Sequence, residues 1–120
     1  MEQNAIIGAI ALAALAIFGY ARMFLQGRSE AKLKAVLPEA KILDVRSSGE
    51  FKESRYPGAV NVPLEKLAKS AKKLGNVDGA LVLYCASGAR ARQAARILRG
   101  MGYRRVFVAG TMAKLEKLAG

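Results

Sequence analysis

Hydrophobic residues divide this chain into a long apolar segment near the N-terminus and a second part in which short apolar runs alternate with polar ones. Residues 5–21 carry no charged side chain, and Met23, Phe24 and Leu25 extend the apolar segment beyond Arg22. A helix needs about 20 apolar residues to cross a bilayer core of about 30 Å, with a lower limit near 17. The segment reaches that length if the Arg22 side chain extends toward the headgroups. It therefore predicts a transmembrane helix.

Two other interpretations of this segment stay open. A cleaved signal peptide normally begins with basic residues and ends at small ones. Here Glu2 precedes the run, and no convincing cleavage site follows Tyr20. A core helix of a small domain normally has an apolar stripe, whereas this run is hydrophobic all round. We favour an N-terminal transmembrane anchor that occupies residues 1–28.

Charges on either side of the apolar segment predict its orientation. The basic residues Arg22, Arg28, Lys32 and Lys34 follow the segment, while Glu2 precedes it. By the positive-inside rule, the chain is expected to cross the cell (inner) membrane once, with residues 29–120 in the cytoplasm. Small residues recur every four positions, which allows a weak homodimer through the anchor, although so Ala-rich a segment shows this spacing by chance.

The periodicity of residues 29–120 predicts one α/β domain. The expected strands are residues 41–45, 59–62, 80–84 and 105–109, and the expected helices are residues 29–37, 64–74, 89–101 and 112–118. Residues 47–53 are expected to be a loop or a short helix. Ser29 is a candidate cap for the first of these helices, which Pro38 ends. The apolar stripe of the helix over 64–74 is expected to comprise Leu64, Leu67, Ala68, Ala71 and Leu74. That of the helix over 89–101 is expected to comprise Ala91, Ala94, Ala95, Leu98 and Met101, with Arg92, Arg96 and Arg99 facing solvent. Strands that alternate with helices imply a small parallel sheet flanked by helices.

Composition narrows the chemistry that this domain can perform. The 120 residues include no histidine and one cysteine, and the formal net charge is +11. Catalysis by an imidazole base is therefore excluded, and so is a zinc site with two or more thiolates. The positive charge attracts anions, either at a membrane surface or as small oxyanions. No basic stripe interleaved with aromatic residues is present, so we expect no nucleic-acid partner.

The single cysteine, Cys85, follows the most apolar of the expected strands. It begins the segment Cys85-Ala86-Ser87-Gly88-Ala89-Arg90, which leads directly into an expected helix. Ligands bind beyond the carboxyl ends of parallel strands. Backbone N–H groups of such a loop, together with the positive end of the helix, favour an anion. These features can lower a thiol pKa from about 8.5 to about 3.5–7.5, so we expect a thiolate at neutral pH.

Each residue of this loop also has a simpler interpretation. A lone cysteine is often a small buried hydrophobe, but its place between an apolar strand and a loop with a glycine and an arginine favours a nucleophile. Ser87 either donates a hydrogen bond to a bound sulfur or caps the helix. Arg90 either binds the sulfonate of a thiosulfate-like donor or forms an ion pair on the helix surface.

Several motifs in a fixed order resemble the rhodanese family. The segment 85–90 is similar to its Cys-x-x-Gly-x-Arg loop, Leu43-Asp44-Val45-Arg46 to its Asp-Val-Arg strand, and Glu50-Phe51 and residues 57–64 to the stretch that follows. The resemblance covers about residues 30–119. It implies a rhodanese-like α/β fold and a thiosulfate sulfurtransferase, which moves sulfane sulfur through a persulfide on Cys85 to a thiol, a protein or cyanide. It implies neither a metal nor an organic cofactor.

Three departures from the family pattern affect the expected pocket rather than the fold. Arg55 stands where the family usually has a histidine and adds a cation near the mouth of the site. Thr111 replaces the second glycine of a pair, and Leu115 replaces a tryptophan. We assign substrate binding to Ala86, Ser87, Gly88, Ala89, Arg90 and Arg55, and catalysis to Cys85.

Two other functions remain open. The fold also resembles certain cysteine phosphatases, but these use Cys-x5-Arg, and the spacing here is Cys-x4-Arg. The shorter loop suits a sulfur atom better than a tetrahedral phosphate. A non-enzymatic, membrane-tethered module that carries a persulfide or senses sulfur is the main alternative to the enzyme.

Overall fold

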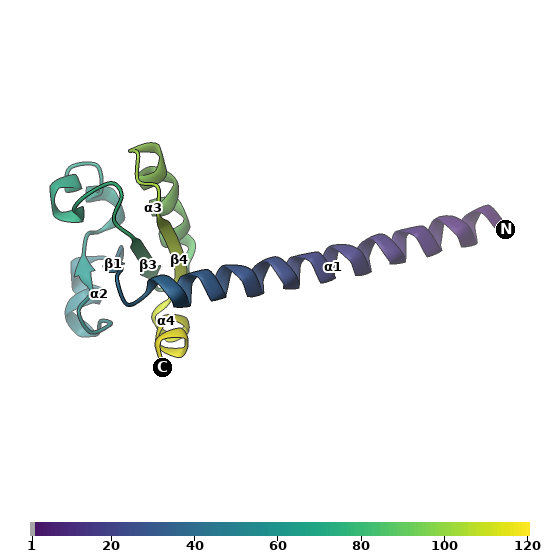
Figure 1. Cartoon of the computed structure of the whole chain (residues 1–120), viewed down its shortest axis with the longest axis horizontal. Coiled ribbons are helices and arrows are strands. Elements are labelled where there is room, and N and C mark those ends of the chain that lie inside the picture. Colours follow the sequence, from purple (N-terminus) through teal and green to yellow (C-terminus); the bar gives the residue numbers. More distant parts are fainter. Residues whose placement is uncertain (1) are drawn as a thin grey trace. The chain divides into compact units, whose positions relative to one another are not determined.

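The structure is a computed structural model that describes residues 2–120, with the side chains of residues 71 and 72 outside the description. The chain divides into two compact units, one that extends to Lys32 and one that begins at Leu33. The first unit is part of one helix, and the second holds every strand (Figure 1).

The helix α1 runs without interruption from Glu2 to Val36. At 1.5 Å per residue its 35 residues extend over about 52 Å. The expectation of a separate helix that Ser29 caps is wrong, because residues 28–36 contain no helix breaker and simply continue the turns already formed. The helix stops ahead of Pro38, where the ring restricts the preceding residue.

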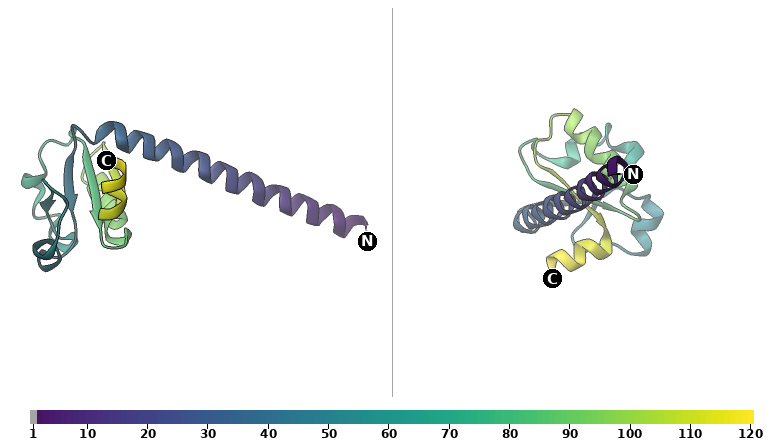
Figure 2. Two further views of the ribbon diagram at one scale, coloured as in Figure 1. Left: turned by 90° about the horizontal axis from the view of Figure 1, so that it is seen from below. Right: turned by 90° about the vertical axis from the view of Figure 1, so that its right-hand side faces the viewer.

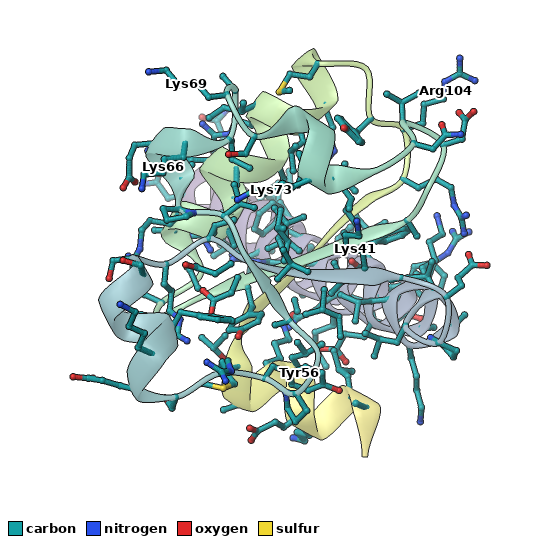
Figure 3. All side chains as sticks on the ribbon, turned by 90° about the vertical axis from the view of Figure 1, so that its left-hand side faces the viewer. Lys41, Tyr56, Lys66, Lys69, Lys73 and Arg104 are labelled. Atoms are coloured by element: carbon teal, nitrogen blue, oxygen red, sulfur yellow. The ribbon has the colours of Figure 1, made fainter. Side chains whose placement is uncertain are left out.

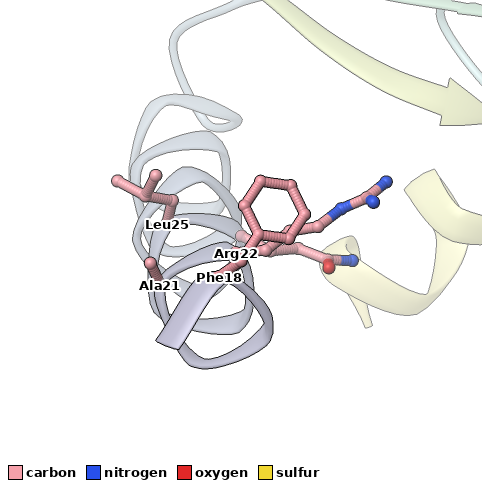
Figure 4. Close-up of a pocket in the computed structure, with 5 residues that line it drawn as sticks. Phe18, Ala21, Arg22 and Leu25 are labelled. Atoms are coloured by element: carbon pink, nitrogen blue, oxygen red, sulfur yellow. The ribbon is translucent and has the colours of Figure 1, made fainter. Parts of the chain in front are cut away.

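The described residues of α1 before Glu30 are all exposed, and the helix is long and apolar enough to cross a membrane. A shallow depression on its surface is lined by Phe18, Ala21, Arg22, Leu25 and Gln26 (Figure 4). All five residues come from three turns of one helix. The depression is therefore a groove between neighbouring side chains rather than an enclosed site.

Four parallel strands form the sheet of the second unit, as the sequence predicted. They are β1 (Lys41–Asp44), β2 (Val60–Asn61), β3 (Leu81–Cys85) and β4 (Val106–Thr111), in the order β2-β1-β3-β4. The central strand β3 is buried along its whole length. The register between β3 and β4 shifts after Leu83, which pairs with Val108, so that Tyr84 pairs with Gly110. This bulge brings Gly110 to the end of β3.

Helices cover both faces of this sheet (Figures 1 and 2). One face packs against α3 (Ala89–Gly100), whose Ala91, Ala94, Ala95 and Leu98 are buried as expected. The other face packs against α4 (Met112–Ala119) and the last turn of α1, through Leu115, Leu33 and Val36. Leu33 and Val36 thus belong to the core of the domain, although they continue the N-terminal helix.

The helix expected over residues 64–74 is replaced by two short 3-10 helices, η1 (Leu64–Lys66) and η2 (Ala71–Leu74). Leu67 and Leu74 are buried in the core, whereas Ala68 is exposed. Ala71, which the expected apolar stripe also included, lies outside the described side chains. Two anchoring leucines seven positions apart do not require a continuous helix, and the intervening chain turns at Ser70 instead.

Polar side chains of this segment lie on one side of the domain. Lys66, Lys69 and Lys73 lie over η1 and η2, while Tyr56 lies across the sheet from them (Figure 3).

The short helix α2 (Ser48–Glu53) follows β1 and begins with a capping box, in which the Ser47 hydroxyl accepts from the Glu50 amide and the Glu50 carboxylate accepts from the Ser47 amide. The capping box gives Glu50 a defined position beside the carboxyl end of the sheet.

Candidate active site

Cys85 is the last residue of β3, so the strand ends one position later than the sequence predicted. Its side chain is 1% exposed and belongs to the core on the α3 side of the sheet. The thiol is therefore enclosed by apolar neighbours on most sides. Any reagent must approach it from the loop that follows.

That loop aims one backbone amide at the sulfur. The N–H of Gly88 donates to the Cys85 Sγ over 2.9 Å, and Gly88 adopts the left-handed conformation with φ 95°. Among the described residues, Gly88 supplies the hydrogen bond that the sulfur receives. Ala89 begins α3, so the positive end of a 12-residue helix lies directly behind the same amide. Both features favour negative charge on the sulfur.

The other loop residues are placed around this hydrogen bond. Ala86, Ser87 and Ala89 are exposed, whereas Gly88 is buried. The N-cap of α3 is Gly88, and no side chain caps the helix, so the interpretation of Ser87 as an N-cap is wrong. The left-handed turn at Gly88 provides the change of direction instead. The Ser87 hydroxyl remains available to a ligand at the open side of the loop.

Arg90 forms an ion pair with Glu50, which lies 40 positions earlier in the chain. The Arg90 Nη1 is 2.7 Å from the Glu50 Oε1, and the Arg90 Nη2 is 3.0 Å from the Oε2. About a third of each side chain is exposed. The surface ion pair that we considered for Arg90 is therefore present, and a donor sulfonate would share or compete for this guanidinium.

The two charges stabilise each other. The hydrogen bond from Arg90, followed by the backbone hydrogen bond from Ser47, lowers the pKa of Glu50 to about 2. The same contact with Glu50 raises the pKa of Arg90. Glu50 was part of the family motif but was not predicted to contact the loop, because capping residues give no sign of long-range partners.

Gly88 also makes a close backbone approach that the sequence did not indicate. A Cβ atom built on Gly88 would lie 3.1 Å from Arg92 Nη1 and 3.5 Å from the Cα of Gly110. Gly110 has φ 96° and lies at the bulge of β4. The loop that holds Cys85 thus lies between the end of β4 and the Arg92 side chain. A side chain at position 88 would be strained by the positive φ and would require a small shift of the Arg92 guanidinium.

A buried ion pair connects the end of β1 to the segment after α2. The Arg46 guanidinium donates through Nε and Nη2 to the Asp44 carboxylate, with Nη2 2.7 Å from Oδ2, and Nη2 also donates to the Ser54 carbonyl over 2.6 Å. The Asn61 amide donates to the backbone carbonyls of Asp44 and Arg46. The hydrogen bond to Asp44 raises the pKa of Arg46.

Tyr84 extends this network to the opposite face of the sheet. Its ring is fully buried, its hydroxyl accepts from the Tyr56 amide over 3.0 Å, and the Arg46 guanidinium lies 5.6 Å from its ring centroid. Burial raises the pKa of Tyr84 to about 12. The residue before Cys85 is therefore anchored to both β1 and the segment after α2, which restricts movement of the strand end.

Arg55 lies on the exposed segment that follows α2. Its guanidinium is 4.8 Å from the centroid of the Phe51 ring, in a cation–π contact. Thr111 caps α4 by accepting from the Lys114 amide, and Leu115 is fully buried in the core. Thr111 and Leu115, which depart from the family pattern, thus have structural roles that explain why the fold tolerates them.

The sequence has known relatives. The model of the rhodanese-like domain family matches residues 29–111. The putative sulfur carrier protein YrkF of Bacillus subtilis is 37% identical over a region that covers 54% of this chain and 35% of that protein. The human thiosulfate:glutathione sulfurtransferase is 34% identical, over 53% of this chain and 67% of that protein.

A solved structure described as a rhodanese with anions from E. coli has a TM-score of 0.60 and 29% identity, over 62% of this chain and 89% of that one. The region that matches the sulfur carrier protein YrkF spans only about a third of the length of that protein. The relatives of this chain are named for sulfur transfer or sulfur carriage.

Proposed function

Because this chain belongs to the family of rhodanese-like domains, we propose that it is a sulfurtransferase, which moves sulfane sulfur from a thiosulfate-like donor to a thiol or cyanide through a persulfide on Cys85. In the first step the Cys85 thiolate attacks the outer sulfur of thiosulfate. The sulfur–sulfur bond of the donor breaks, sulfite leaves with the electron pair, and Cys85 carries a persulfide anion. In the second step an acceptor thiolate or cyanide attacks the terminal sulfur, and the Cys85 thiolate is released.

The observation that carries this proposal is the hydrogen bond from the Gly88 amide to the Cys85 Sγ at the start of α3. A charged acceptor receives stronger hydrogen bonds than a neutral one, so the loop favours the thiolate over the thiol. The persulfide that follows is also an anion. The exposed loop residues Ala86, Ser87 and Ala89 and the Arg90 guanidinium surround the side from which a donor approaches. Arg55 is assigned to the mouth of the same site.

The proposal is tested by intact-protein mass spectrometry after mixing with thiosulfate. The expected result is a gain of one sulfur atom that a reducing agent removes and that the Cys85→Ser variant does not show. Steady-state formation of thiocyanate from thiosulfate and cyanide then measures turnover. Sulfur transfer that persists in Cys85→Ser, with the fold intact by circular dichroism, would refute the role of this residue.

A persulfide-carrying or sulfur-sensing module is the second candidate. One finding favours it: the relative YrkF is a putative sulfur carrier protein. A carrier would accept one sulfur atom and then stall with cyanide, whereas the enzyme would turn over many times. The single-turnover and steady-state experiments therefore separate the two candidates.

We further propose that residues 1–28 anchor the domain of residues 29–120 to the cell (inner) membrane as a single span. The exposed apolar surface of α1 supports this proposal, and the basic residues that follow the apolar segment support a cytoplasmic domain. Extraction with alkaline carbonate should leave the full chain in the membrane fraction. Protease added outside spheroplasts should leave the domain uncut, and cleavage there would reverse the orientation.

A further inference from the structure

Among the residues that the structure describes, Arg92 lies beside the Cys85 loop and has no carboxylate partner. Arg92 lies two positions after Arg90 on α3 and is exposed, as the sequence predicted. Its Nη1 lies 3.1 Å from the position that a Cβ would take on Gly88, the glycine whose amide donates to the Cys85 Sγ. Its guanidinium therefore lies beside the loop rather than away from it.

Charge balance distinguishes the two arginines of the loop. Arg90 holds both terminal nitrogens against the Glu50 carboxylate, so that pair is neutral as a unit. In the described part of the chain, Arg92 has no ion pair, and α3 contains no acidic residue that could supply one. A guanidinium without a carboxylate partner attracts a bound anion more strongly than a paired guanidinium does.

On these grounds, and given the proposed sulfur transfer, we infer that Arg92 is the specificity-determining cation of the site. Its guanidinium binds the oxyanion end of the donor while the outer sulfur reaches Cys85. A planar guanidinium suits this role because it offers paired donors to two oxygens of one sulfonate. Binding of the donor sulfonate, which was predicted for Arg90, then belongs to Arg92. Arg90 instead links the loop to α2 through its ion pair with Glu50.

Arg96 provides a matched control on the same helix. It lies four positions after Arg92, on the same flank of α3 and one turn farther from the loop, and it is also exposed. Arg92→Gln and Arg96→Gln remove the same charge from the same surface. Net charge and long-range attraction thus change equally, and only the distance from Cys85 differs.

Two measurements test the inference. The first compares the rate constants for alkylation of Cys85 by iodoacetate and by iodoacetamide, which differ in charge but hardly in size. Arg92→Gln should lower the ratio of the iodoacetate rate constant to the iodoacetamide rate constant about fivefold, which corresponds to about 1 kcal/mol of charge interaction. Arg96→Gln should leave this ratio within twofold of the wild-type value. Arg92→Lys should retain most of the ratio, and high salt should reduce the difference.

The second measurement is the dependence of sulfur transfer on thiosulfate concentration. Arg92→Gln should raise the KM for thiosulfate about tenfold with kcat within twofold, whereas Arg96→Gln should change neither. Equal effects of the two substitutions, or none, would overturn the inference. If the wild-type protein gains no sulfur but the alkylation ratio falls only in Arg92→Gln, the proposed function fails and the placement of the cation stands.

Discussion

Glu50 and Arg90 form a two-point ion pair that joins the capping box of α2 to the first turn of α3, with separations of 2.7 and 3.0 Å. The pair links the segment after β1 to the loop after β3. These two strands are neighbours in the sheet, so their carboxyl ends lie side by side. Three features thus hold the loop around Cys85 in place. They are its covalent connection to β3, the ion pair between Arg90 and Glu50, and the close approach of Gly88 to Gly110.

The ion pair should make the domain less stable in acid. The pKa of Glu50 is about 2 in the folded chain and near 4.5 in the unfolded chain. The ion pair therefore contributes fully to the free energy of unfolding above pH 4.5, and this contribution is lost as the pH falls toward 2. Since about a third of the side chain is exposed, we expect about 1 kcal/mol. Urea denaturation at pH 7 and pH 3 should show a smaller loss of stability in Glu50→Gln than in the wild type. An identical loss in both proteins would contradict the coupling.

Substitution at Gly88 should disable the site at a modest cost in stability. Gly88→Ala forces a side chain into φ 95° and against the Arg92 guanidinium and Gly110, which should cost about 1–2 kcal/mol and displace the amide that contacts Cys85. Sulfur loading should fall at least tenfold. Gly102→Ala is the control, because Gly102 has φ 101° with open space around it. It should lose similar stability but load sulfur normally, and equal loading by both variants would remove the role of the amide.

Tyr84 should make the domain sensitive to alkali. Because burial raises the pKa of Tyr84 to about 12 from about 10, its stabilising contribution is complete below pH 10 and is lost as the pH rises through 12. Tyr84→Phe leaves the Tyr56 amide without its acceptor and should cost about 1 kcal/mol at pH 8. The difference from wild type should shrink at pH 11 in chemical denaturation. A difference that stays constant with pH would show that the hydroxyl does not titrate with unfolding.

The N-terminal helix should contain both dispensable and essential leucines. Leu33 is 4% exposed and packs into the core of the domain, so Leu33→Ala should lower the free energy of unfolding by about 2–3 kcal/mol. Leu25→Ala, in the same helix but 62% exposed, should leave unfolding of the detergent-solubilised chain unchanged. Equal effects would mean that the last turn of α1 does not form part of the domain core.

The sequence alone was sufficient for the elements that have strong local signals. The continuous apolar run over residues 80–84 predicted a buried central strand, and the spacing of Ala91, Ala94, Ala95 and Leu98 predicted the buried face of α3. The loop sequence predicted several N–H groups directed at an anion, and among the described residues the structure shows one of them, that of Gly88, donating to the Cys85 Sγ. In each case neighbouring residues carry the whole pattern, because periodicity and backbone conformation are local properties.

Tertiary structure decided the features that depend on partners far apart in the chain. Residues 64–74 have a helical pattern but form two 3-10 helices, since burial of Leu67 and Leu74 outweighs weak local preference. The helix predicted from Ser29 instead continues α1. Arg90 meets Glu50 and Arg92 lies against Gly88 only because the sheet brings β1, β3 and β4 together. Spacing along the chain predicts Cys85 as the nucleophile, but which cation is free to bind a substrate depends on pairings that only the folded chain creates.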